Sequence, residues 1–160
     1  MGEIIRLSKK HLGQLAELDF ESGHEMGIAR GVTLQEHKRE LVERFNRGHE
    51  LFFGYKEDGI LKGYATVKPF FPGYKHCEMY WLSVRKAFHG KGIGTALVNF
   101  IEEYARKQGF RKVCLYTNKT MNETRRFYER HGYALINEFP EYYGYNDTSK
   151  NTAVLYAKIL

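Results

Sequence analysis

A glycine-rich turn is the feature that most constrains how this chain folds. Between a strand-like run that ends at Val84 and a helix-like run over 95–108 stand the letters His89-Gly90-Lys91-Gly92-Ile93-Gly94-Thr95. Alternate glycines let the main chain approach a ligand closely and turn several N–H groups to one side. The first helical turn adds unpaired donors and a partial positive charge. The turn therefore predicts a cradle for an anion such as a pyrophosphate, with Lys91 as an added cation.

Two other phosphate-binding loops do not fit these letters. A P-loop needs a Lys-Ser or Lys-Thr pair after its last glycine, and Gly94 is followed by Thr95 alone. The dinucleotide fingerprint G-x-G-x-x-G needs its third glycine one position later than Gly94. From the letters alone, a tight connection that binds nothing stays open as an alternative.

The remaining periodicity predicts one domain, residues 1–160, in which strands and helices alternate. A break is expected at 20–31, and a slightly long loop is expected around Glu57-Asp58-Gly59. Capping boxes, Thr33 to Glu36 and Thr120 to Glu123, open two of the helices. The expected strands are 4–7, 51–55, 60–68, 77–84, 112–117, 134–139 and 153–159, and the expected helices follow Ser8 and cover 34–45, 95–108 and 123–131.

Composition narrows the class of protein. Lys and Arg number 25 against 19 Asp and Glu, a net charge of +6, which suits an anionic ligand. The basic residues are spread along the chain, so a nucleic-acid-binding domain, the rival interpretation, lacks a clustered patch. Cys77 and Cys114 stand outside any metal-ligand spacing and are expected as buried thiols, with no metal site. No apolar run is long enough for a membrane span, and a cytoplasmic location is expected.

Three motifs together resemble one known family. The turn fits the pattern [QR]-x-x-G-x-[GA] at Gly92 and Gly94, with His89 where Gln or Arg is usual. The strand before it ends in the triplet Leu82-Ser83-Val84, and an aromatic motif runs from Phe127 to Tyr133. In this order the chain resembles the GNAT superfamily of acyl-CoA-dependent N-acetyltransferases over nearly its whole length.

The resemblance implies a mixed α/β fold with a splayed, mostly antiparallel central sheet and about four helices. It also implies acetyl-CoA as co-substrate and an amine-bearing acceptor. Its cofactor-binding positions correspond to Leu82, Ser83 and Val84 on the strand, to His89, Gly90, Lys91, Gly92, Ile93, Gly94 and Thr95 in the turn, and to Asn122. Asn122 departs from the family pattern, because many members have this Asn one position earlier, where Met121 stands. Peptide-acetylating relatives also place Glu where this chain has Tyr116.

Acetyl transfer to an amine needs a group that takes the amine's proton. An ammonium of pKa about 10.4 costs about 4–5 kcal/mol to deprotonate at pH 7. We expect Glu78 to be this base, and strict alternation puts His76 and Tyr80 on its strand face as other relays. A solvent-facing Glu78 with no such role is the plain alternative.

The leaving thiolate needs an acid, and the resemblance implies Tyr128. Neighbouring helical residues point about 100° apart, so we expect Phe127 to pack inward while Tyr128 reaches the cofactor. A main-chain N–H at the end of strand 77–84 is expected to meet the tetrahedral oxyanion.

Two loops are expected to choose the acceptor: 20–31, and 141–151 with Tyr142, Tyr143 and Tyr145. A non-catalytic acyl-CoA-binding module on the same fold is the alternative function. Neither a nucleic acid nor a membrane is expected as partner, and the oligomeric state is left open, a homodimer included.

Overall fold

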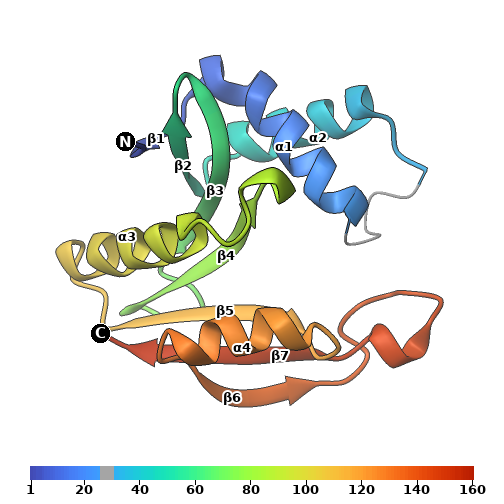
Figure 1. Ribbon diagram of the computed structural model, residues 1–160. Helices are drawn as coiled ribbons and strands as arrows, with labels where there is room; N and C mark the ends of the chain where they lie inside the picture. The colour runs from blue at the N-terminus through green and yellow to red at the C-terminus, as the bar shows by residue number, and fades with distance from the viewer. Residues whose placement is uncertain (26–30) are drawn as a thin grey trace.

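The computed structural model describes residues 1–25 and 31–160. Seven strands form one sheet in the order β1-β2-β3-β4-β5-β7-β6, with helices packed on it (Figure 1). The strands are β1 (Glu3–Arg6), β2 (Leu51–Glu57), β3 (Ile60–Pro69), β4 (His76–Val84), β5 (Lys112–Asn118), β6 (Ala134–Phe139) and β7 (Ala153–Ile159). The helices are α1 (Leu12–Glu25), α2 (Leu34–Asn46), α3 (Ile93–Lys107) and α4 (Asn122–Arg130), with short 3₁₀ turns at Lys9–His11, Lys86–Phe88 and Thr148–Lys150. This is the expected mixed α/β architecture.

The sheet divides into two halves that part at β4. Every neighbouring pair of strands is antiparallel except β4 and β5, which run parallel. Their pairing covers three residues and ends at Glu78 opposite Cys114. Beyond Glu78 the two strands diverge, as Figure 1 shows, and the β5-facing edge of β4 has no strand partner among the described residues. The splayed sheet is therefore confirmed.

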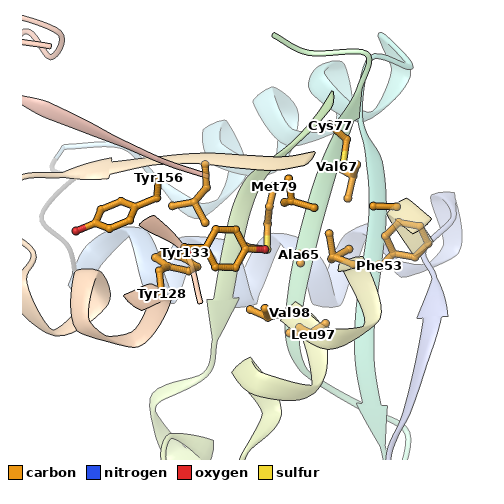
Figure 2. Close-up of a cluster of buried hydrophobic side chains, with 14 of the residues drawn as sticks. Phe53, Ala65, Val67, Cys77, Met79, Leu97, Val98, Tyr128, Tyr133 and Tyr156 are labelled. Atoms are coloured by element: carbon orange, nitrogen blue, oxygen red, sulfur yellow. The ribbon is translucent and has the colours of Figure 1, made fainter. Parts of the chain in front are cut away.

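Two apolar cores lie on opposite faces of the first half of the sheet. Neighbouring residues alternate between them: Phe53 and Ala65 face α3, whereas Phe52 and Tyr64 face α1 and α2. The larger core continues under α4, where Tyr128 joins α3 residues and strand residues from both halves (Figure 2). This shared core holds the two halves together across the split. Its burial of large apolar side chains is the main term that stabilises the fold.

Two local expectations about turns were wrong or incomplete. The β2–β3 loop is a tight two-residue turn and not a long one, because Asp58 (φ 52°) and Gly59 (φ 78°) both adopt the left-handed conformation that such hairpins need. No break occurs at Phe20, since α1 continues to Glu25. Residues 26–30 of the expected break lie outside the described residues.

The two predicted capping boxes have different outcomes. Thr33 and Glu36 form theirs, with the Glu36 N–H donating to Thr33 Oγ1 at 3.2 Å and the Thr33 N–H donating to Glu36 Oε2 at 2.9 Å. The second box is wrong: Met121 precedes α4 without a side-chain cap. Thr120 instead donates its N–H and hydroxyl to Asn118 Oδ1, at 3.0 and 2.8 Å, so the turn after β5 uses the side chain expected to cap the helix.

Cys77 and Cys114 are buried free thiols, as expected. Across the described ranges 1–25 and 31–160, no helix is both long and apolar enough to cross a lipid bilayer.

Candidate active site

The glycine turn forms an open set of main-chain donors at the start of α3. Gly90 (φ 73°) and Gly92 (φ 78°) are both left-handed, which an L side chain rarely tolerates, and Gly92 is the residue that caps α3. In the described part of the chain no acceptor occupies the N–H groups of residues 90–95. The helix begins at Ile93, two residues earlier than expected, so its positive end lies inside the turn. These amides are available to an anion.

Two histidines hold this turn in place. His89 Nε2 donates to the carbonyl oxygen of Val84 at 2.7 Å and thus joins the turn to the end of β4. His131 lies at the end of α4, with Nε2 at 3.1 Å from Thr95 Oγ1 and Nδ1 at 2.7 Å from the carbonyl oxygen of Phe127. The histidine at the position where the family pattern has Gln or Arg therefore supports the conformation of the turn through a hydrogen bond to the main chain.

A groove of about 560 Å³ runs from the end of β4 over the turn to α4. It brings together nine of the eleven predicted cofactor-binding residues: Leu82, Ser83, Val84, His89, Gly90, Gly92, Ile93, Gly94 and Thr95. Two are not among its walls. The Lys91 ammonium lies 5.2 Å from the centre of the Phe88 ring at the groove's margin, and Asn122 is exposed at the start of α4.

Sequence reasoning missed five further residues of this groove: Phe88, Glu123, Thr124, Phe127 and Arg130. Arg130 is the cation that lines the groove, in the role expected of Lys91. It stands three residues before Tyr133 within the aromatic motif, and a basic residue in the last turn of a helix is an ordinary feature, so nothing in the letters distinguished it.

A second cavity, of about 350 Å³, lies on the other side of Leu82. Its walls come from β4, β5, the start of α4 and the segment between β6 and β7. Glu78 and the three predicted tyrosines Tyr142, Tyr143 and Tyr145 all line it. Other walls were not predicted as such: Met79, Trp81, Tyr116, Thr117, Asn118, Met121 and Thr124. The other segment expected to choose the acceptor, 20–31, includes Ser22. This residue lies on α1 and accepts a hydrogen bond of 2.5 Å from the Ser83 hydroxyl.

Glu78 is a buried carboxylate that faces the second cavity. The residue is 4% exposed, which excludes the solvent-facing alternative. No hydrogen bond is among the influences on its carboxylate within residues 1–25 and 31–160, where Lys68 and Glu50 act on it through charge alone. Burial raises its pKa, Lys68 on the neighbouring strand lowers it, and Glu50 raises it. A carboxylate with a raised pKa is better matched to accept a proton near neutral pH.

A β-bulge changes the expected face of Tyr80. Val67 pairs with Met79 and Thr66 with Trp81, so Tyr80 is an extra residue in β4. The alternation expected from Glu78 therefore fails at this point, although Tyr80 still lines the cavity. The Lys68 ammonium lies 3.1 Å from the centre of its ring. His76, the other expected relay, is not among the residues that line either cavity.

Tyr128 stands where the two cavities meet. It lines both of them, together with Leu82 and Thr124. The residue is 7% exposed, and burial raises the pKa of its phenol, which keeps it protonated. Its hydroxyl has no hydrogen-bond partner in the described chain. The expectation that Phe127 is the inward-facing member of this pair was wrong. Tyr128 is the more buried ring, whereas Phe127 is half-buried and packs close to Gly94.

Comparisons with known proteins agree with this geometry. A family model described as the acetyltransferase (GNAT) family matches residues 15–133. An uncharacterized N-acetyltransferase of Methanocaldococcus jannaschii is 34% identical over 91 residues, which cover 48% of this chain and 39% of that protein. The chain spans between 30% and 49% of the length of the curated relatives it matches.

Two solved structures share the fold. A protein of Desulfovibrio desulfuricans described as a GNAT-family acetyltransferase has a TM-score of 0.80 at 21% identity, covering 99% of both chains. The PaiA N-acetyltransferase of Thermoplasma acidophilum, solved in complex with coenzyme A, has a TM-score of 0.73 at 21% identity and covers 100% of this chain and 99% of its own.

Proposed function

The chain belongs to this acetyltransferase family, and from that premise we propose that it moves an acetyl group from acetyl-CoA to a primary amine by direct attack in a ternary complex. One observation supports the proposal above the others. A groove with free main-chain amides and a cavity with a buried carboxylate share a wall at Tyr128. Two substrates bound on either side of that wall meet there, which is the arrangement that direct transfer needs.

The groove fits the chemistry of coenzyme A. The diphosphate offers several acceptors to the amides of residues 90–95, and each helix-end contact contributes about 0.3–1 kcal/mol, so several are needed at once. Arg130 and the exposed Lys91 supply positive charge nearby. The unpaired edge of β4 beyond Glu78 offers main-chain groups to the pantetheine arm, as an added strand would use them. Asn122, exposed outside the groove walls, stays a weaker candidate.

We propose Glu78 as the group that removes the acceptor's proton. An amine reacts as the neutral base, so its ammonium proton passes to the Glu78 carboxylate, directly or through water, before or during attack. The nitrogen then forms a bond to the thioester carbon. A main-chain N–H near Leu82, at the end of β4, is the proposed donor to the oxyanion.

We propose Tyr128 as the acid that completes the reaction. When the tetrahedral intermediate collapses, the C–S bond breaks and the sulfur takes the electron pair. The buried phenol, kept neutral by its raised pKa, donates its proton to that sulfur. The nitrogen loses its second proton to the Tyr128 phenolate, directly or through water, which restores the phenol. The products are the acetylated amine and the free thiol, and Glu78 returns its proton to solvent.

Replacing Tyr128 with Phe tests the proposal. With thiol release as readout and a panel of amines as acceptors, we expect kcat to fall about 10²- to 10⁴-fold. Calorimetry should show that acetyl-CoA affinity is retained, because the ring stays in the core. Tyr74, an exposed tyrosine remote from both cavities, provides the matched control Tyr74→Phe.

Each outcome has a distinct meaning. Unchanged turnover in Tyr128→Phe rejects the acid role. Acetyl-CoA binding without thiol release for any amine would favour a non-catalytic acyl-CoA-binding module, and an absence of acetyl-CoA binding would reject both functions.

We further propose that the acceptor is a soluble amine in the cytoplasm and that neither nucleic acid nor membrane is a partner, because charges of both signs alternate along the chain.

A further inference from the structure

The acceptor cavity has a size that limits what it can hold. Its volume of about 350 Å³ is at the small end of ligand sites. A cavity of this volume suits a small molecule. Part of that space lies beside Tyr128, where the acetyl group has to arrive. The acceptor that fills the cavity is therefore compact.

Aromatic residues are half of those that line the cavity, seven of fourteen. Tyr116 and Tyr142 stack with ring centres 5.6 Å apart and planes 14° apart, and Tyr143 and Tyr145 stack at 5.4 Å and 25°. Trp81 of β4 also lines the cavity. Such rings bind an apolar or flat body through their faces, and they also attract a cation.

The residues that line the cavity carry negative charge only, and it comes from Glu78. Glu78 carries the only carboxylate among the described residues that line it, and none of those lining residues is Lys, Arg or His. Its carboxylate is almost fully buried and without a partner in the described chain. Arg44, the nearest guanidinium to Tyr80, is bound to Glu50 through two hydrogen bonds of 2.7 and 2.6 Å. The lining itself therefore offers a partner to one positive charge and none to a negative one, while the Lys68 ammonium, outside the lining, lies 3.1 Å from the centre of the Tyr80 ring and lowers the pKa of Glu78.

Other polar groups of the wall are few. Asn118 is already hydrogen-bonded on both sides of its amide, since its nitrogen donates to the carbonyl oxygen of Lys150 at 2.6 Å and its oxygen accepts from Thr120. Thr117 and Thr124 are the remaining hydroxyls that are not phenols. The Trp81 indole N–H has no hydrogen-bond partner in the described chain. Side-chain partners for a chain of peptide groups are thus this N–H, the two threonines and the phenols, and the free edge of β4 is the proposed partner of the pantetheine arm.

We propose that the acceptor is a compact monoamine with one ammonium group, a small apolar or aromatic body and no carboxylate. This inference rests on the proposed function. The ammonium lies against Glu78, which is also its base, and the body lies among the tyrosines. A polyamine brings further cations that find no carboxylate, and a free amino acid brings a carboxylate next to Glu78.

A matched set of amines tests this inference by thiol release. 2-Phenylethylamine carries one ammonium and an aromatic body, and phenylalanine is the same molecule with a carboxylate added. Spermidine and an alanine-initiated tetrapeptide represent the other acceptor classes. We expect kcat/KM for 2-phenylethylamine to exceed that of each of the other three by at least about tenfold, since an unpaired buried charge is costly. Equal or better turnover of phenylalanine, spermidine or the peptide overturns the proposal.

A binding measurement separates this inference from the transfer reaction itself. Calorimetry with 2-phenylethylamine, on the full chain saturated with coenzyme A, does not depend on turnover. We expect binding that Tyr142→Leu weakens about fivefold to tenfold and that Tyr74→Leu leaves unchanged. Binding without thiol release upholds the monoamine site and contradicts the transferase proposal. Thiol release with the peptide but no binding of 2-phenylethylamine upholds transfer and overturns the monoamine site.

Discussion

The cofactor groove and the acceptor cavity share a wall but are built from different materials. The groove presents main-chain amides from six consecutive residues, 90–95, held by His89 and His131. The cavity presents side chains from two strands, a helix and a long connection. Main-chain donors suit a ligand with many equivalent acceptors, whereas a ring-lined cavity with one carboxylate discriminates by shape and charge. The comparison suggests that cofactor binding and acceptor choice can be changed independently.

The largest expected effect comes from a substitution in the acceptor cavity. Glu78→Gln keeps the shape of the side chain and removes the base, so we expect kcat to fall about 10²- to 10⁴-fold. Thiol release measures kcat, and calorimetry should give an unchanged affinity for acetyl-CoA. Glu103→Gln, at an exposed position on α3, is the matched control. A Glu78→Gln protein with wild-type kcat contradicts the role of this carboxylate.

A smaller effect is expected on the groove side. Gly92 and Gly109 share a φ of 78° with open space where a Cβ would stand, so Gly92→Ala and Gly109→Ala should lower the free energy of unfolding alike, by about 1–2 kcal/mol. Only Gly92 lines the groove. We expect Gly92→Ala alone to raise the Kd of coenzyme A about tenfold, about 1.4 kcal/mol, by calorimetry. Equal Kd values in the two variants would show that the turn does not hold the cofactor.

The smallest expected effect is a shift in pH dependence. As a base, Glu78 acts when ionised, so activity rises as pH rises through its pKa, which burial sets above the ordinary value. Lys68 lowers that pKa. Lys68→Met keeps the apolar stem and removes the cation, so the acidic limb of kcat/KM should move to higher pH while the plateau changes less than about threefold. A limb that stays in place or moves to lower pH assigns it to another group.

The groove could be predicted from sequence because its geometry is local. Left-handed glycines, a helix start and the strand before it all appear in consecutive letters, and nine predicted residues line the groove. The same local logic found the Thr33 capping box and the strands. Local reasoning failed where two hydrogen-bonding arrangements compete for one side chain. Thr120, for example, bonds to Asn118 instead of capping α4.

The cavity could be predicted only in part because tertiary contacts assemble it. Glu78 stood out as a carboxylate in an apolar strand, and the tyrosines of 142–145 as a cluster. The bulge at Tyr80 leaves no mark in the letters, and it ends the alternation used to place side chains on β4. The inward position of Tyr128 depends on how α4 packs against both halves of the sheet, which helical geometry alone does not set.

The account depends on the unpaired amides of the glycine turn, and amide NMR tests them most directly. Coenzyme A is added to ¹⁵N-labelled protein, and the N–H signals of residues 90–95 are followed. We predict that these signals shift most, and that they shift with a Kd equal to the calorimetric one, because the amides become donors to the diphosphate. Saturable binding of coenzyme A that leaves these signals unmoved would contradict the account.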